Sequence, residues 1–236
     1  MPIENNLTYK ISIIIPSLNE SENLPLLLSD LSEINSESEV LIVDSMSKDN
    51  TSEIALNYGA KFFKVNEMNR GLQLHFGAKN AKSDWLLFIH ADSRLKENWS
   101  KEIKAVMNRN YDLIYFFRFK IQNNKMIYRI LEILVNLRCL IFKKPYGDQG
   151  LLISKNQYIK IGGFKNTPIM EDIDFINRIK VKNNLIPLTT CIYTSSRKWE
   201  KTNFISQAIK NWNLRRKWIK GESINSIYQS YYDRKD

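Results

Sequence analysis

Two aspartates that follow short apolar runs could hold a metal ion or a nucleotide. Asp92 closes the segment Phe88-Ile-His-Ala-Asp92, and Asp44 closes Leu41-Ile-Val-Asp44. A carboxylate at Asp92 could bind a divalent cation whose shell is completed by phosphate oxygens. A carboxylate at Asp44 could accept hydrogen bonds from a base or a ribose. Each could instead cap the turn or helix that follows, as aspartates after strands often do.

A second pair of acids, Glu171-Asp172, could provide a general base that removes a proton from an attacking hydroxyl group. Asp174 follows two residues later, and acids also collect at helix starts because they oppose the helix dipole. The turn at Gly162-Gly163-Phe164 lies just upstream of the pair. We favour the catalytic interpretation and keep the capping one as its alternative.

The chain has no glycine-rich phosphate loop. It contains eight glycines, and neither GxGxxG nor GxxxxGK[ST] occurs in it. A bound nucleoside diphosphate would therefore need another source of positive charge, for which a divalent metal held by few carboxylates is the usual substitute. This favours Asp92 as a metal ligand.

The elements that must position these residues can be read in the first hundred positions. Apolar runs without polar alternation predict strands that are buried on both faces, at 11–15, 40–43, 61–65 and 85–89. Helical spacing predicts helices between them, at 24–31, 50–59 and 71–82, the first after an Asn19-to-Glu22 segment that resembles a capping box. This alternation indicates a doubly wound, mostly parallel α/β sheet, which binds ligands beyond the carboxyl ends of its strands.

The second half is less regular. Residues 126–142 are mostly apolar, but Arg129, Glu132 and Asn136 fall on one face, which predicts an amphipathic helix rather than a membrane span. A last helix is expected over 203–220. We expect one domain over 1–236, with a nucleotide-binding half to about residue 100, an acceptor half over 101–200 and a C-terminal helix and tail over 201–236.

Taken in order, these segments resemble the family 2 glycosyltransferases, and in particular a small bacterial branch of that family. The resemblance spans roughly residues 11–216. It rests on Ile11-to-Glu20, Leu41-to-Thr51, Asn69-Arg-Gly-Leu-Gln73, Phe88-to-Asp92, Tyr146-Gly-Asp-Gln-Gly150, Met170-Glu-Asp172 and Arg197-Lys-Trp-Glu200. His90 stands where many relatives carry an acid. It could ligate Mn²⁺ but is a poor ligand for Mg²⁺, so we prefer a supporting or packed role for it.

The resemblance implies a GT-A fold with a C-terminal helical extension, and an inverting, metal-dependent sugar transfer from a nucleotide sugar. The metal would be Mn²⁺ or Mg²⁺. The implied roles are nucleotide binding for Pro16, Glu20, Asp44, Arg70 and Gln73, metal binding for Asp92, catalysis for Asp172 with Glu171, and contact with the acceptor or diphosphate for Asp148, Gln149, Arg197 and Trp199. We favour UDP over GDP, and the acceptor is unidentified.

Two other functions fit parts of the sequence. A nucleotidyltransferase would need a glycine-rich basic loop after the first strand, where this chain has Ser17-Leu-Asn-Glu20. A non-catalytic module on an anionic membrane would explain the basic C-terminal segment, but not the ordered series of acids.

Composition narrows the class of protein further. The net charge is +10 over 236 residues, yet no nucleic-acid-binding motif accompanies it. We therefore expect no nucleic-acid partner. Cys139 and Cys191 lie in no CxxC spacing, and the start lacks a signal-peptide pattern, so we expect a cytoplasmic protein. Trp212 and Trp218 lie among basic residues and could meet an anionic membrane peripherally, although a docked helix with a solvated basic face is favoured.

Overall fold

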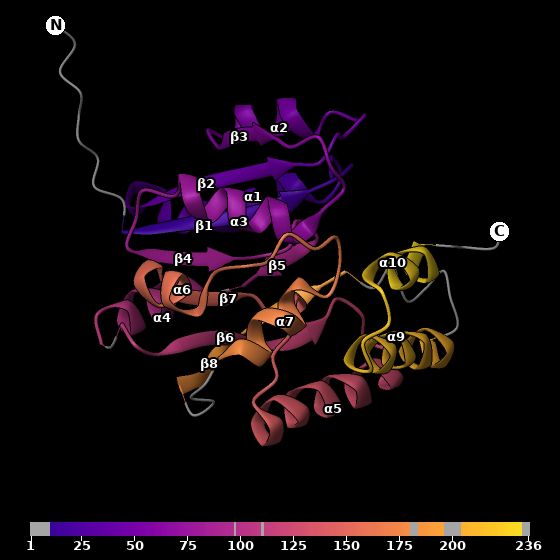
Figure 1. Ribbon diagram of the computed structural model, residues 1–236. Helices are drawn as coiled ribbons and strands as arrows, with labels where there is room; N and C mark the ends of the chain where they lie inside the picture. The colour runs from indigo at the N-terminus through magenta and orange to yellow at the C-terminus, as the bar shows by residue number, and fades with distance from the viewer. Residues whose placement is uncertain (1–9, 97, 110, 180–183, 196–203, 233–236) are drawn as a thin grey trace, which may run out of the picture.

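The computed structural model describes residues 10–96, 98–109, 111–179, 184–195 and 204–232. Its centre is a single eight-stranded sheet with the order β3-β2-β1-β4-β7-β6-β8-β5 (Figure 1). The strands are β1 (Ile11–Ser17), β2 (Ser38–Asp44), β3 (Lys61–Lys64), β4 (Trp85–Phe88), β5 (Ser93–Leu95), β6 (Ile114–Ile121), β7 (Leu151–Ser154) and β8 (Leu185–Thr194).

The first four strands of the chain run parallel to one another. β7 then pairs antiparallel with both β4 and β6, β8 runs parallel to β6, and β5 closes the far edge antiparallel to β8. The sheet is thus mostly parallel, as predicted. All four strands expected in the first half are confirmed, each to within two residues at either end.

Helices cover both faces of the sheet, which explains why the strands read as unbroken apolar runs. Ile11, Ile13 and Ile15 of β1 pack on one face with the helices α1 and α4, whereas Ile14 packs on the other face with α3, α6 and α7. The helices are α1 (Leu24–Leu31), α2 (Thr51–Asn57), α3 (Arg70–Asn80), α4 (Trp99–Met107), α5 (Met126–Phe142), α6 (Lys155–Ile161), α7 (Glu171–Arg178), α9 (Phe204–Ile219) and α10 (Ile224–Tyr232). Two short 3₁₀ helices are η1 (Ser32–Glu37) and η2 (Gly147–Gln149).

The predicted capping box at Asn19 is wrong. Helix α1 begins at Leu24, with Asn23 before it and a proline in its first turn. Asn19 instead adopts a left-handed conformation with φ of 53°, which asparagine tolerates better than most residues. Its side-chain oxygen accepts a hydrogen bond from the amide of Lys48 at 2.8 Å, so Asn19 joins the loops that follow β1 and β2.

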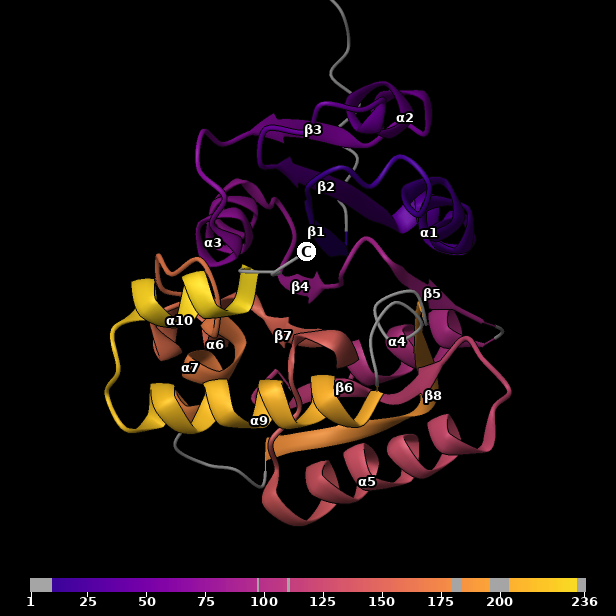
Figure 2. The same ribbon diagram turned by 90° about the vertical axis from the view of Figure 1, so that its right-hand side faces the viewer.

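The C-terminal helical extension is confirmed, with a second helix, α10, that was not predicted. Leu214 of α9 and Ile227 of α10 form a small core with Ile169 and Met170, the residues just before α7. Figure 2 shows α9 and α10 next to α7. The extension therefore rests against the segment just before α7, the helix that begins with Glu171 and Asp172. Among the described residues, no helix has the length and apolar character needed to cross a bilayer.

The packing of α3 on the sheet gives a test of the fold. A Cβ atom added to Gly77 would collide with Ile14 of β1 and press on Val43 of β2. Glycine to alanine inside a helix ordinarily stabilises it by about 1 kcal/mol. We expect Gly77→Ala to destabilise the protein instead, by about 1–3 kcal/mol, because overpacking displaces the helix. Urea unfolding measures the change. The exposed Lys79→Ala on the same helix should stay within about 0.5 kcal/mol, and a stabilised Gly77→Ala would contradict the packing described.

Candidate active site

The carboxyl ends of β1 and β2 are tied together by Asp44. This residue is only 1% exposed and lies opposite Ser17 in the parallel pairing of the two strands. Its carboxylate accepts hydrogen bonds from the hydroxyl of Ser17 at 2.9 Å and from the amide of Ser47 at 2.8 Å, and the hydroxyl of Ser47 also donates to it. Asp44 thus fixes the loop that follows β2.

Helix α3 begins at the same edge of the sheet. Asn69 caps it by accepting a hydrogen bond from the amide of Leu72 at 2.9 Å. The side-chain amide of Gln73 donates to the carbonyl oxygens of Ser17 and Val43, at 2.9 and 2.7 Å. Because Gln73 is 5% exposed, it joins this helix to both strand ends.

Glycine is required on the other side of that helix start. The amide of Gly71 donates to the carbonyl of Thr167 at 3.0 Å, and a Cβ atom at Gly71 would collide with the backbone of residues 165–167. Arg70 is thereby held between the strand ends and the segment that leads to α7.

Two hollows meet at this edge. The first, which we call the β1 pocket, brings together five of the six residues predicted to bind nucleotide or metal, Pro16, Glu20, Arg70, Gln73 and Asp92. His90 lines it as well. The second, which we call the cleft, shares Arg70, His90 and Asp92 with the β1 pocket and adds Arg138, Tyr146, Asp148, Asp172 and Arg215. Asp92 and His90 therefore lie where the two hollows join.

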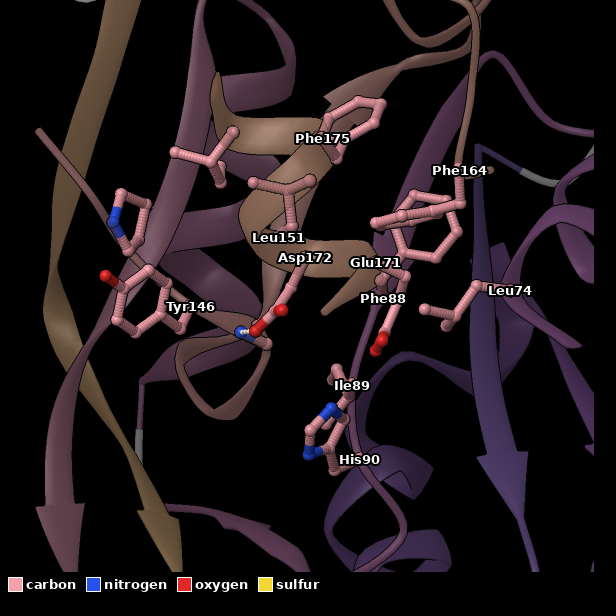
Figure 3. A pocket seen from close by; sticks show the side chains of 14 residues that line it. Leu74, Phe88, Ile89, His90, Tyr146, Leu151, Phe164, Glu171, Asp172 and Phe175 are labelled. Carbon is pink, nitrogen blue, oxygen red and sulfur yellow. Dashed lines mark hydrogen bonds between the residues drawn. The ribbon is translucent and has the colours of Figure 1, made fainter. Parts of the chain in front are cut away.

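Helix α7 delivers Asp172 to the cleft. Met170, the residue before the helix, is left-handed with φ of 62°. The Asp172 carboxylate accepts a hydrogen bond from the amide of Gly147 at 2.8 Å (Figure 3). It accepts another from the amide of its neighbour Ile173 at 2.8 Å. A Cβ atom at Gly147 would lie 2.9 Å from Nε2 of His90, so only glycine lets these three segments approach.

Glu171 has a different environment from its neighbour. It is 1% exposed and points among Leu74, Phe88 and Phe164 (Figure 3). Its nearest cation is Arg70, with 3.5 Å between Nη1 and Oε1. Burial raises the pKa of Glu171 to about 7, although Arg70 opposes this. Both acids line this apolar pocket, but of the two only Asp172 also lines the cleft.

The remaining predicted residues divide into three groups. Asp148 lines the cleft. Gln149 is buried, where its side chain donates to the carbonyl of Phe117 at 3.2 Å and accepts from the thiol of Cys139 at 2.9 Å. Gln149 therefore contacts protein groups and lines neither the β1 pocket nor the cleft. Arg197 and Trp199 lie outside the described residues.

Two cations in the cleft were not predicted to lie there. The guanidinium groups of Arg138 and Arg215 lie 4.0 and 5.0 Å from the ring centre of Tyr146. Arg138 comes from α5 and Arg215 from α9. Arg138 stands alone in an apolar sequence, and Arg215 is one of a basic cluster, so neither gave a signal for this site. Together they make the cleft suitable for an anionic group.

Comparison with known proteins agrees with the resemblance. Residues 12–167 match the family described as Glycosyl transferase family 2. An uncharacterized glycosyltransferase of Haemophilus influenzae is 27% identical over 205 residues, covering 79% of this chain and 69% of the relative. The 4,4'-diaponeurosporenoate glycosyltransferase of Staphylococcus haemolyticus is 33% identical over 185 residues, covering 69% of this chain and 49% of the relative. The chain thus spans about half to two thirds of these relatives' length.

Solved structures share the fold at low identity. S. aureus TarS, solved with UDP-GlcNAc, matches with a TM-score of 0.64 and 18% identity over 79% of this chain and 58% of that one. Glucosyl-3-phosphoglycerate synthase of Mycobacterium tuberculosis, solved with Mn²⁺ and UDP, matches with a TM-score of 0.55 and 15% identity over 79% of this chain and 70% of that one. The fold is therefore of the GT-A type, and the chain belongs to glycosyl transferase family 2.

Proposed function

We propose that the protein is an inverting glycosyltransferase that moves a sugar from a nucleoside diphosphate to an acceptor hydroxyl group. The observation that carries this proposal is that Asp92 and Asp172 line one cleft, together with Arg70 and His90. A carboxylate suited to a metal and a carboxylate suited to proton transfer therefore face the same space, as transfer from a nucleotide sugar requires.

The nucleoside would occupy the β1 pocket, against Pro16 and Glu20. Asp44 lies behind two residues of its wall, Ser17 and Ser45, so we propose that it supports base binding by fixing them. UDP is the favoured nucleotide, supported by the structural relatives that were solved with UDP and UDP-GlcNAc. The loop from Ser17 to Glu20 contains an acid and no glycine, which argues against the triphosphate site of a nucleotidyltransferase.

The metal would be held by Asp92. Within the described residues, no three His, Cys, Asp or Glu side chains form a metal cluster, so the ion would need oxygens from the diphosphate to complete its shell. This donor set fits Mn²⁺ or Mg²⁺, which are commonly bound by one or two carboxylates and substrate phosphates. When bound, the ion would offset the charge of the leaving diphosphate. Mn²⁺ is present in the structural relative from M. tuberculosis.

Asp172 would act as the base. Its hydrogen bonds to the amides of Gly147 and Ile173 orient the carboxylate before the acceptor arrives. One base on the side opposite the leaving diphosphate gives a single displacement, and hence inversion at the anomeric carbon. Glu171 would position Arg70, its nearest cation.

Acceptor or diphosphate contacts would come from Asp148 in the cleft, and we retain Arg197 and Trp199 as residues that close over it. Gln149 would act through packing, since it holds η2 against β6. We propose a cytoplasmic location because Cys139 and Cys191 are free thiols.

The metal assignment is tested by Asp92→Ala. Loss of the carboxylate should abolish the Mn²⁺-dependent part of UDP binding, while stability changes by only about 1 kcal/mol if Asp92 also caps a turn. Calorimetric titration of UDP with and without Mn²⁺ measures this. The exposed Asp84→Ala serves as control and should bind like the wild type. If Asp92→Ala keeps full Mn²⁺-dependent affinity, Asp92 is not the ligand.

The base assignment is tested by Asp172→Asn, which keeps the size of the side chain but removes its capacity to accept a proton. Transfer should fall about a hundred- to ten-thousand-fold, with donor binding nearly unchanged because the group acts on the acceptor. The matched control is Asp174→Asn in the same helical turn, which pairs with Lys165 and Arg178 rather than facing the cleft. Equal losses in both variants would indicate a helix-capping role instead of a catalytic one.

The buried state of Glu171 predicts a pH effect on stability. The unfolded chain ionises this group near its ordinary pKa of 4.5, whereas the folded protein does so near 7. The protonated Glu171 side chain therefore contributes fully to the free energy of unfolding below about pH 4.5. This contribution, on the order of 3 kcal/mol, is lost as the pH rises from about 4.5 to about 7. Glu171→Gln should flatten the curve of unfolding free energy against pH in this range. Curves that run parallel for wild type and variant would show that Glu171 ionises normally.

A further inference from the structure

Helix α5 turns its polar residues toward the sheet. The Glu132 carboxylate accepts a hydrogen bond from the amide of Ile121 at 2.7 Å. The side-chain amide of Asn136 accepts from the amide of Phe119 at 2.9 Å and donates to its carbonyl at 3.0 Å. These side chains satisfy backbone groups of β6 much as a neighbouring strand would. Polar side chains of α5 are thus buried against the sheet beside Tyr128, Leu131 and Val135, which pack on Phe119 and Ile121.

The apolar face of α5 is consequently turned outward. Its residues recur at helical spacing over the whole helix, a length of about 25 Å, and no other labelled element lies beyond it in the view of Figure 1. Nine large apolar side chains of α5 are between 41% and 74% exposed: Met126, Ile127, Ile130, Ile133, Leu134, Leu137, Leu140, Ile141 and Phe142. A continuous exposed apolar face of this kind marks an interaction surface.

The net positive charge of the chain is concentrated in two segments, one that contains α5 and one that contains α9. Residues 118–144 contain seven lysine or arginine residues and one glutamate, and residues 204–220 contain five basic residues and no acid. Together these two segments carry a net charge of +11, so the rest of the 236-residue chain has a net charge of −1. The exposed cations Lys125 and Lys144 lie at the two ends of α5.

Helix α9, which lies near α5, also exposes large apolar side chains. It runs beside α5 in Figure 2, and both helices contribute walls to the cleft. Ile209, Trp212 and Ile219 of α9 are between 53% and 66% exposed. Arg216 and Lys217 are exposed on the same helix. Helix α9 therefore exposes both apolar and basic side chains, and α5 is flanked by a lysine at each end.

We propose that the outer face of α5, flanked by the basic residues of α9, docks the protein on an anionic lipid bilayer. Such a surface accepts apolar side chains at the acyl boundary and attracts lysine and arginine through its head groups. A second copy of the chain is the competing occupant, but it would bring two strongly basic surfaces together. The cleft adjoins the docked surface, because Leu131 and Val135 of α5 line it.

Vesicle sedimentation tests the proposal independently of any enzymatic activity. The full chain should sediment with vesicles of phosphatidylcholine mixed with phosphatidylglycerol, and poorly with phosphatidylcholine alone. The triple variant Ile130→Ser, Leu134→Ser, Ile141→Ser should lose at least about tenfold in partitioning. Ile159→Ser is the matched control, since Ile159 of α6 is 64% exposed and lies on another helix. Lys125→Gln with Lys144→Gln should weaken binding about fivefold for each lysine and tests the charge without touching apolar residues.

Absence of binding to the anionic vesicles at low salt would overturn the proposal, as would equal partitioning of the α5 variant and the Ile159→Ser control. Analytical ultracentrifugation tests whether a second copy of the chain, rather than a bilayer, covers the α5 face. A wild-type dimer that the triple variant converts to a monomer would assign the α5 face to a second copy and would also overturn membrane docking. A wild-type monomer that binds anionic vesicles through α5 would support membrane docking.

Discussion

The arrangement of the cleft depends on one hydrogen bond, from the amide of Gly147 to the carboxylate of Asp172. It is possible because β4 and β7 pair antiparallel, with Phe88 opposite Leu151. The residues just after β4 and just before β7 are thereby neighbours, which brings His90 against Gly147. The start of α7 then completes the junction. Three segments that are distant in sequence meet within a few ångströms, and the absence of a side chain at Gly147 is what allows them to do so.

This junction separates two adjacent acids by environment. Asp172 borders both the apolar pocket and the open cleft and has fixed hydrogen-bond donors, whereas Glu171 is buried in the apolar pocket, where burial raises its pKa. Neighbouring carboxyl groups with such different surroundings can take different roles in one reaction. The C-terminal helices support the same junction, since Leu214 and Ile227 pack on the residues before α7.

The first half of the fold could be predicted because its strands are buried on both faces and its helices have clear periodicity. The second half could not be predicted, because short segments such as β7 form strands through pairing with their neighbours rather than through a local sequence pattern. Residue types alone also could not distinguish side chains that line the cleft from side chains that only support the surrounding structure. Gln149, for example, stands in a motif but is fully buried. For α5 the helix was predicted with its observed bounds, but which face it buries depends on β6, whose exposed backbone groups recruit Glu132 and Asn136.

The central claim is that Asp172 drives a single displacement at the anomeric carbon of a nucleotide sugar bound beside Asp92. It can be tested before the acceptor is known, because water can replace the acceptor in slow donor hydrolysis. Proton NMR of the first sugar released from α-linked UDP-sugars in the presence of Mn²⁺, with GDP-sugars in parallel, reports its configuration before mutarotation. The account predicts that the β-anomer appears first and that its release requires Asp172. Initial release of the α-anomer would contradict it.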